Sequence, residues 1–250
     1  MGEFRWPQGK RAAVSLSFDD ARPSQLEVGL PILNAYGVRA SFYVTISQME
    51  RRLQDWRSAL EAGHEIGNHT LSHPCSGNFP WSRANALEDY TLERMEADLL
   101  QATAQITRLV GRAPQTFAYP CGQKFVGRGR EVQSYVGLIA THFIVGRGFR
   151  EEAPNDPTFC DLAQAAGVDF DGMTWAQCQG WLEQTRQVGG WLLLAGHDVG
   201  ESGRQVVRTE TLEALCRYCQ DPANGFWIDT VAEIGSYIRQ AQTEGYHPKR

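Results

Sequence analysis

Two histidines four positions apart, His69 and His73, are the residues of this chain whose types and spacing most directly indicate chemistry. An adjacent acid pair, Asp19 and Asp20, and a late His197 complete a set of groups that hydrolytic metal sites use. A divalent transition metal at such a site takes imidazole and carboxylate ligands and leaves positions open for water and substrate. The sequence therefore predicts a metal-dependent hydrolase.

The metal ligands that we predict are Asp20, His69 and His73, which supply one carboxylate and two imidazoles. The HxxxH spacing can place both rings on one face of a helix, although Pro74 limits that helix to a single turn. Taken alone, this spacing is just as typical of surface or core histidines. Its combination with the double Asp is what favours a metal site.

Two adjacent carboxylates at a strand end repel each other and lose solvation, which is costly unless a cation or a shared proton relieves them. An Asp that caps the next helix would explain Asp20 but not both acids. We expect Asp20 to bind the ion and Asp19 to be the base for a water whose pKa the ion can lower to about 7. His197 could protonate the leaving group, although a lone buried histidine is more often a core residue.

The elements that must position these groups alternate along the chain. Short, apolar, β-rich runs predict strands at 12–18, 40–44, 65–67, 116–118, 139–145, 191–195 and 226–228. Helical spacing covers 26–36, 53–62, 87–110, a part of 175–188, 209–218 and 230–240. This alternation implies parallel strands joined by helical crossovers, in a barrel or an open sheet. The polar groups follow several strand ends, which favours the barrel, because its chemistry lies on the loops after the strands.

Length and charge limit the classes of protein. A chain of 250 residues without repeats or linker-like runs predicts one domain over 1–250, with a core of about 10–240. The net charge of -5 disfavours a nucleic-acid partner, and the apolar runs are too short for membrane insertion. The polar start lacks the apolar region of a signal peptide, so the chain as written is expected to be cytoplasmic. A removed export signal would leave the compartment open.

The six cysteines are ordinary usage at this length, and their number does not demand an oxidising compartment. Cys216 and Cys219 are the one close pair and are expected to be core residues. Cys75 and Cys121 could lie near the ion, where a thiolate could compete as a ligand. Because one Asp and two His already complete an open site, we expect both of these cysteines to take no part.

The same residues, in their order along the chain, resemble the motifs of the polysaccharide deacetylase family, the NodB-homology domain. Residues 17–20, Ser-Phe-Asp-Asp, are similar to its first motif, TFDD, and residues 63–74 are similar to its second, built on H-[ST]-x-x-H. Residues 117–122 stand where the third motif belongs, and residues 192–198 resemble the fifth, an apolar strand leading into a catalytic histidine. The resemblance covers roughly residues 10–240.

The resemblance implies an α/β fold, a distorted (β/α) barrel with fewer than eight repeats, that removes acetyl groups from a carbohydrate. It implies one divalent ion, zinc with cobalt or nickel as alternatives, on the three ligands named above, with Asp19 as the base and His197 as the acid. A backbone N–H near Tyr119 to Gly122 would help the ion to hold the oxyanion. The expected oxyanion and substrate pocket comprises Tyr119, Pro120, Cys121, Gly122, Leu194 and Trp175. The expected partner is an acetylated carbohydrate, and the oligomeric state stays open.

The sequence departs from the family in the third motif, R-P-P-Y-G, where Ala118 occupies the position of the arginine that orients the catalytic Asp and Cys121 that of the aromatic residue. We predict that Arg147, at the end of the following strand, supplies this charge, with a plain surface arginine as an equal alternative. The fourth motif, DxxDW, is echoed imperfectly by Asp169, Asp171 and Trp175. A partner for His197 therefore stays unassigned.

Two rival functions stay open. A metal-dependent amidase for a small non-sugar amide could use the same barrel, since a fold does not fix the substrate. A non-catalytic carbohydrate-binding barrel is disfavoured, because binding alone would need neither the base nor the acid. Four tryptophans could stack on sugar rings or simply pack in the core or at the rim: Trp6, Trp81, Trp175 and Trp181.

Overall fold

Strand β1 (Ala12–Asp19) lies in the middle of the main sheet, and all eight of its residues are buried. The structure is a computed structural model that describes residues 4–245. A parallel strand that is buried on both faces needs apolar side chains, and β1 has them at all of its first seven positions except Ser15 and Ser17. Its one acid therefore falls at the last position, where the strand leaves the sheet.

Seven further strands complete this sheet: β2 (Ser41–Val44), β3 (Glu65–Asn68), β4 (Thr116–Ala118), β7 (Val145–Arg147), β8 (Val168–Asp169), β9 (Trp191–Gly196) and β12 (Phe226–Ile228). They lie in the order β7-β4-β3-β2-β1-β9-β8, and β12 pairs with β1. Every one of these pairings is parallel. The carboxyl ends of the strands consequently meet at one rim.

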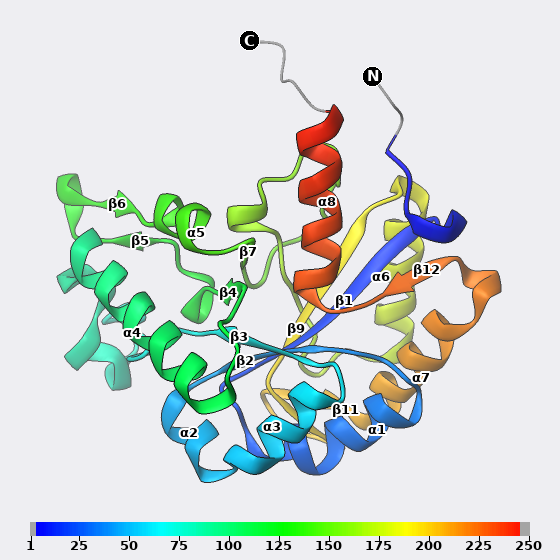
Figure 1. Cartoon of the computed structure of the whole chain (residues 1–250), viewed down its shortest axis with the longest axis horizontal. Helices are drawn as coiled ribbons and strands as arrows, with labels where there is room; N and C mark the ends of the chain where they lie inside the picture. The colour runs from blue at the N-terminus through cyan, green and yellow to red at the C-terminus, as the bar shows by residue number, and fades with distance from the viewer. Residues whose placement is uncertain (1–3, 246–250) are drawn as a thin grey trace.

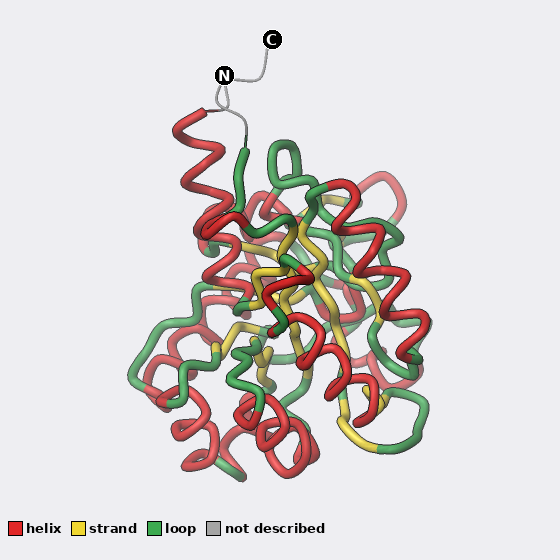
Figure 2. The backbone as a smooth tube through the Cα atoms, turned by 90° about the vertical axis from the view of Figure 1, so that its right-hand side faces the viewer, coloured by secondary structure: helices red, strands yellow, loops and turns green. Residues whose placement is uncertain are grey.

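The described part of the chain has eight α-helices, which surround the strands (Figure 2): α1 (Leu30–Ala35), α2 (Ile46–Arg51), α3 (Leu53–Glu61), α4 (Leu92–Val110), α5 (Val136–His142), α6 (Trp175–Val188), α7 (Thr209–Gln220) and α8 (Val231–Gly245). Local chemistry fixes their ends. The Thr91 side chain caps the start of α4, and Gly111 ends it with a φ of 75°. Thr174 and Gln177 form a capping box at the start of α6.

Short elements fill the connections. A π-helical turn (Gln25–Gly29) precedes α1, and 3-10 turns cover Pro7–Gly9, Pro80–Asn85, Leu87–Asp89, Pro120–Gly122, Gly129–Glu131, Leu162–Gln164 and Pro222–Asn224. Two small sheets pair β5 (Phe125–Val126) with β6 (Gln133–Ser134) and β10 (Asp198–Gly200) with β11 (Val206–Arg208). The first small sheet lies far to one side of the main sheet, beyond α5 and next to the start of α4 (Figure 1).

The main sheet curls until its outer strands nearly meet. Arg147 at the end of β7 forms a parallel bridge with Ala165, which lies just before β8, and the Gly148 N–H donates to the Ala165 carbonyl at 2.8 Å. Seven strands in this path confirm the prediction of a distorted (β/α) barrel with fewer than eight repeats. Both ends of the described chain lie at the same end of the molecule, where Phe4 and Tyr237 contact each other at 6.0 Å between ring centroids (Figure 1).

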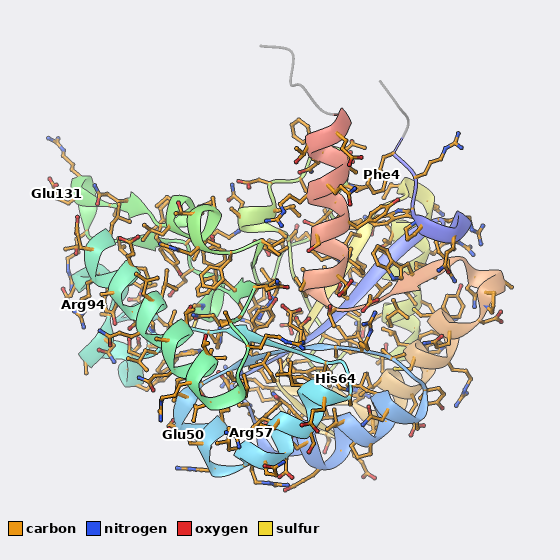
Figure 3. All side chains as sticks on the ribbon, viewed as in Figure 1. Phe4, Glu50, Arg57, His64, Arg94 and Glu131 are labelled. Carbon is orange, nitrogen blue, oxygen red and sulfur yellow. A yellow bond between two sulfur atoms is a disulfide. The ribbon has the colours of Figure 1, made fainter. Side chains whose placement is uncertain are left out.

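Three apolar clusters hold the helices on the strands. The largest joins β1, β2 and β9 to α1, α3, α6 and α7, and it contains Cys216 and Cys219, which are buried as predicted. A second lies under α8 around Trp191, and a third lies under α4 and α5 around Phe117 and Tyr119. Figure 3 shows side chains filling the space between helices and strands, whereas Arg94 and Glu131 lie at the outer edge.

One predicted strand is wrong. The run 139–145 is divided, because Ile139 to His142 belong to helix α5 and the strand is Val145–Arg147. A short apolar run fits a strand or a buried helix equally well, and only its partners decide. Helix α2 and the two-residue strand β8 were not predicted. None of the helices within residues 4–245 combines the length and the hydropathy that a membrane span requires.

Candidate active site

The polar residues of interest all come from the ends of strands. Asp19 and Asp20 end and follow β1, His69 follows β3, Tyr119 follows β4, Arg147 ends β7, Asp171 follows β8, and His197 follows β9. In parallel barrels this rim carries the chemistry, because the loops from several strands meet there. The fold therefore collects side chains that lie far apart in the sequence.

Three of these side chains form a group that could hold a metal ion. Asp20, His69 and His73 offer ligand atoms that all lie within 4.8 Å of one another. Asp20 Oδ1 is 3.7 Å from His69 Nε2 and 3.5 Å from His73 Nε2. Ligands that bind a tetrahedral zinc ion at about 2.1 Å are about 3.4 Å apart, and both distances from Asp20 are close to this value. The set also leaves a position open for water or substrate.

The tautomer of His69 suits this role. Its Nδ1 lies 2.9 Å from the Ala118 carbonyl oxygen, and a carbonyl can only accept, so Nδ1 carries the proton. The Nε2 atom that faces Asp20 therefore keeps its lone pair, and the carbonyl fixes the ring as an outer partner of a metal ligand would. Burial lowers the pKa of His69 to about 4, which keeps the imidazole neutral near pH 7.

The segment between the two histidines is an irregular loop and not the single helical turn that the HxxxH spacing allowed. Thr70 and His73 have φ values of 64° and 47°, and this left-handed backbone brings the two rings to 4.8 Å between centroids. Asp98 of α4 holds the loop. Its Oδ1 accepts hydrogen bonds from the N–H groups of Leu71 at 2.6 Å and Ser72 at 3.4 Å.

Left-handed backbone is concentrated at this rim. Seven described residues other than glycine have positive φ: Gln8, Asp20, Ala21, Thr70, His73, Cys121 and Arg150. Five of the seven lie in the loops that carry the candidate site. Such conformations cost about 1–3 kcal/mol each and persist where surrounding contacts impose them. At Asp20, for example, the N–H donates to the Tyr43 carbonyl at 2.9 Å, and the Thr45 hydroxyl donates to the Asp20 carbonyl at 2.9 Å.

Asp19 is buried and paired. The Arg147 guanidinium, which is fully buried, donates a hydrogen bond to Asp19 Oδ1, while Asp19 Oδ2 lies 3.9 Å from His69 Nε2. Arg147 also donates to the Gly148 carbonyl at 3.1 Å and lies 5.1 Å from the Tyr43 ring centroid. Burial alone would raise the pKa of Asp19, but the charges of Arg147, His69 and His197 outweigh it and lower that pKa to about 2. The alternative of a surface arginine at 147 is wrong.

Asp20 has an arginine of its own, which the sequence interpretation missed. Arg22 donates to Asp20 Oδ2 at 3.0 Å and to Asp198 Oδ2 at 2.7 Å. Burial would raise the pKa of Asp20, but His69, His73 and Arg22 lower it. Arg22 thus occupies one carboxylate oxygen and leaves Oδ1 to the histidines. Its place two residues after Asp20 was the signal that could have found it.

His197 has the partner that the sequence interpretation left unassigned. This partner is Asp171, which lies two residues after β8. Its Oδ2 is 2.6 Å from His197 Nδ1, and its Oδ1 accepts a hydrogen bond from the His197 backbone N–H at 3.0 Å. Burial would lower the pKa of His197, but the hydrogen bond with Asp171 and the charges of Asp19 and Asp171 raise it. The imidazolium form is stabilised, as a general acid requires. Asp171 was visible in the imperfect fourth motif.

Cys75 and Cys121 form a disulfide, which the sequence interpretation did not predict. The bond agrees with the expectation that neither cysteine is a metal ligand. The bond joins the residue two positions after His73 to the loop that follows β4, and it leaves neither sulfur free as a thiolate ligand. The Cys75 sulfur lies 3.9 Å from His73 Nδ1. Disulfides persist mainly in oxidising compartments. The sequence interpretation missed the pair because the two residues are 46 positions apart.

The loop after β4 has one backbone donor to spare. The Tyr119 N–H donates to the Arg147 carbonyl at 3.0 Å, Pro120 has no N–H, and the Gly122 N–H donates to the Tyr119 carbonyl at 2.9 Å. The N–H of Cys121 has no hydrogen-bond partner among the described residues, and its φ of 54° turns it away from the regular backbone. It is the donor of this loop that remains available to a ligand.

Two residues of the expected pocket lie in packed surroundings. Leu194 is fully buried in β9 within the largest apolar cluster. Trp175 begins α6 and contacts Tyr218 of α7 at 5.7 Å between ring centroids. Their assignment to a substrate pocket remains a prediction. Phe149, in contrast, contacts His197 at 5.7 Å between ring centroids and lies directly beside the candidate acid.

Solved structures share this fold over nearly the whole chain. A protein from Mycobacterium smegmatis has a TM-score of 0.68 at 16% identity, with 100% of this chain and 96% of that chain covered. Peptidoglycan deacetylase PdaC from Bacillus subtilis has a TM-score of 0.55 at 17% identity, with 93% and 94% covered. A CE4 family pseudoenzyme from Bacillus anthracis has a TM-score of 0.54 at 16% identity, with 90% and 65% covered. At these identities the likeness shows the fold alone.

Sequence relatives match shorter parts. Gellan lyase from a Bacillus species is 29% identical over 143 residues, which are 57% of this chain and 5% of that protein. Peptidoglycan-N-acetylglucosamine deacetylase from Bacillus cereus is 32% identical over 66 residues, which are 26% of this chain and 31% of that protein. The chain thus spans less than a third of these relatives. The family model for polysaccharide deacetylase matches residues 7–138, which is more than half of the sequence. The chain therefore belongs to the polysaccharide deacetylase family.

Proposed function

We propose that this protein is a metal-dependent hydrolase that removes acetyl groups from an acetylated oligosaccharide or polysaccharide. The observation that carries this proposal is that two paired side chains, one acidic and one basic, lie beside the open ligand set Asp20, His69 and His73. A carboxylate held by a buried arginine lies 3.9 Å from His69, and a histidine held by an aspartate completes the group. General base and general acid are the two proton-transfer roles that hydrolysis of an ester or amide needs.

Asp20, His69 and His73 would hold one divalent ion, with zinc as our first choice because two imidazoles and a carboxylate suit it. When bound, such an ion lowers the pKa of a coordinated water and polarises the acetyl carbonyl. The chain prepares the ligands for this role. Arg22 fixes Asp20 in a one-oxygen mode, and the Ala118 carbonyl fixes the proton of His69 on Nδ1.

Asp19 is the proposed base. Its pKa of about 2 means that it is ionised at any working pH, and Arg147 fixes the orientation of the carboxylate that accepts the proton. A carboxylate of so low a pKa is a weak base in water. It serves here because the water it deprotonates would itself be strongly acidified at the site. Arg147 replaces in space the charge that Ala118 cannot supply.

His197 is the proposed acid. The raised pKa means that the ring carries its proton further into the neutral range than a free histidine does. Asp171 accepts from Nδ1, so the proton on Nε2 is the one available for the departing sugar oxygen or nitrogen.

The N–H of Cys121 is our candidate for the oxyanion donor. It is the one N–H of Tyr119 to Gly122 without a partner, and the disulfide to Cys75 ties its loop to the loop that carries His73. A donor that needs no rearrangement during the reaction stabilises a developing negative charge best. In this assignment the Cys121 side chain holds the loop in place through the disulfide, and the Cys121 backbone N–H contacts the substrate.

The main alternatives are a non-catalytic carbohydrate-binding barrel and an amidase for a small amide. A relative is called a pseudoenzyme, so the fold alone does not decide. The pairs Asp19–Arg147 and His197–Asp171 favour catalysis, because each buries a charge that binding alone would not require. The names of two relatives, both deacetylases of peptidoglycan, favour an acetylated sugar polymer.

The test is acetate release from a panel of acetylated xylan, chitooligosaccharides and peptidoglycan fragments, each with added zinc, cobalt or nickel. We expect release from at least one carbohydrate, dependent on the metal and abolished by a chelator. A small aryl acetate serves as a substrate without sugar. Turnover of the aryl acetate with no release from any carbohydrate would favour the small-substrate hydrolase, and no turnover of either would favour the binding barrel.

A further inference from the structure

The four tryptophans that could bind sugars have very different surroundings. Trp6 is buried in the cluster under α8, and Trp175 and Trp181 pack partly buried against the largest apolar cluster. Trp81 is different, because 62% of its surface is exposed. An exposed tryptophan that does not serve the core is a candidate for binding a ligand.

Trp81 lies directly beside the candidate metal site. The centroid of its ring is 5.8 Å from that of His73. Trp81 also stacks on Phe79, with 5.4 Å between the ring centroids and 26° between the ring planes, and Phe79 is 40% exposed. The rings of His73, Trp81 and Phe79 thus form a continuous row, and His73 is a proposed metal ligand. The segment between β3 and α4 that carries them lies beside α4 at the edge of the molecule (Figure 1).

The short turn that carries Trp81 is fixed to the site. The buried Ser82 hydroxyl donates to the Cys75 carbonyl at 2.8 Å and accepts the Cys75 N–H at 2.9 Å. The Leu87 N–H donates to the same carbonyl at 3.0 Å, and Cys75 is bonded to Cys121. The exposed rings are therefore attached to both the ligand loop and the oxyanion loop. Binding to such a preorganised surface loses little conformational entropy.

We propose that Trp81 and Phe79 form a stacking surface for the sugar unit next to the one whose acetyl group enters the site. This inference rests on the proposed deacetylase function and deepens it. One face of a pyranose ring presents C–H groups, which an aromatic face attracts through its negative π charge, while the hydroxyl groups at the edge stay in water. The substrate is accordingly an oligomer, and a single acetylated sugar binds poorly.

A purely structural role must be separated from sugar binding, because Trp81 also covers His73. Two substitutions do this. W81L keeps an apolar side chain against His73 but removes the flat ring, whereas W81F keeps a flat ring of smaller area. F159L is the matched control, since Phe159 is 76% exposed and lies in the loop between β7 and β8, away from the Trp81 turn in the sequence.

The experiment compares kcat and KM of the zinc-loaded variants on acetylated oligosaccharides of one to five units and on a small aryl acetate. We expect W81L to raise KM for oligomers of two or more units, and this increase should be about ten times the change in KM for the aryl acetate. W81F should restore most of the loss, F159L should behave as wild type, and the advantage of two units over one should disappear in W81L.

Two results would overturn the inference. The first is an equal loss of kcat/KM in W81L on oligomers and on the aryl acetate, which would mean that Trp81 only supports His73. The second is no loss of kcat/KM on oligomers. Isothermal titration calorimetry of a chitooligosaccharide with wild type and W81L separates this from the proposed function. A wild type that releases no acetate refutes the function alone. Equal affinities of wild type and W81L refute the stacking surface, whatever the turnover.

Discussion

The guanidinium of Arg147 donates a hydrogen bond to the carboxylate of Asp19 across 128 positions of sequence, and both groups are buried. The two residues end strands of the same rim, one on β1 and the other on β7, and β2, β3 and β4 lie between these strands in the sheet. In the function that we propose, Arg147 on the next strand of the sheet supplies the charge that the third motif would carry at the position of Ala118.

Substituting this arginine should change both catalysis and stability. Arg147→Met removes the largest of the charges that oppose burial, so the pKa of Asp19 should rise and the acid limb of the pH–rate profile should move to higher pH. It also leaves a buried charge without its partner, which costs about 3–5 kcal/mol in the free energy of unfolding. Urea unfolding of Arg147→Met combined with Asp19→Asn is the control, because removal of both charges should recover part of that loss. An unshifted acid limb would remove Arg147 from the mechanism.

Asp171→Asn should lower the pKa of His197. In the wild type, the hydrogen bond and the negative charge of Asp171 stabilise the imidazolium and raise the pKa of His197. An asparagine amide can still accept the hydrogen bond but carries no charge, so it stabilises the imidazolium less. The protonated acid would then be lost at lower pH, and the basic limb of the pH–rate profile should move down. The metal content should stay at one equivalent, which distinguishes this variant from a damaged site. A basic limb that stays in place would show that His197 is not the acid.

The disulfide should support both the fold and the site. Its loss should reduce the free energy of unfolding by about 2–4 kcal/mol, because it closes a long loop of the unfolded chain. Reduction by a dithiol converts Cys75 and Cys121 to thiols and loosens the loop of His73, so zinc affinity and turnover should fall together. The variant with serine at both positions should resemble the reduced protein and be indifferent to the dithiol. Cys160→Ser, which alters a free cysteine, should behave as wild type.

His64 should make the fold sensitive to acid. Its Nδ1 accepts the Ala40 N–H at 3.2 Å, its Nε2 lies 3.0 Å from Asn34 Oδ1, and burial lowers its pKa to about 4. The unfolded chain therefore binds a proton below about pH 6.5 while the folded chain does not until about pH 4, so stability falls as the pH falls through this window. The contribution is about 3 kcal/mol. Denaturant unfolding at several pH values should show a shallower fall for His64→Gln, and identical slopes would refute this.

The sequence predicts the fold well where residues carry a local signal. Strand β1 is a continuous apolar run that ends in two acids, and α4 ends at Gly111, so both could be placed from the sequence. The alternation of these elements indicated a barrel or an open sheet, and the polar groups at the strand ends favoured the barrel. The run at 139–145 failed because apolar residues do not distinguish a buried helix from a strand without their neighbours.

The site was harder to predict where tertiary contacts decide. The ligand set was visible in the motifs, but the left-handed backbone at Thr70 and His73 was not, because such φ values normally indicate glycine. Asp171 follows a strand of only two residues, which carries no periodic signal. The disulfide joins cysteines whose nearness depends on two loops meeting at the rim. These features are consequences of the completed fold.

Acetate release from an acetylated oligosaccharide, measured while zinc is added to the metal-free protein, tests the central claim most directly. Wild type should become active with one equivalent of zinc, and His69→Ala should lose tight binding. Asp19→Asn should bind one equivalent yet be slower by about a hundred- to ten-thousand-fold, the usual contribution of a general base. Full zinc binding at wild-type affinity by His69→Ala, or a near-normal rate in Asp19→Asn, would contradict the account.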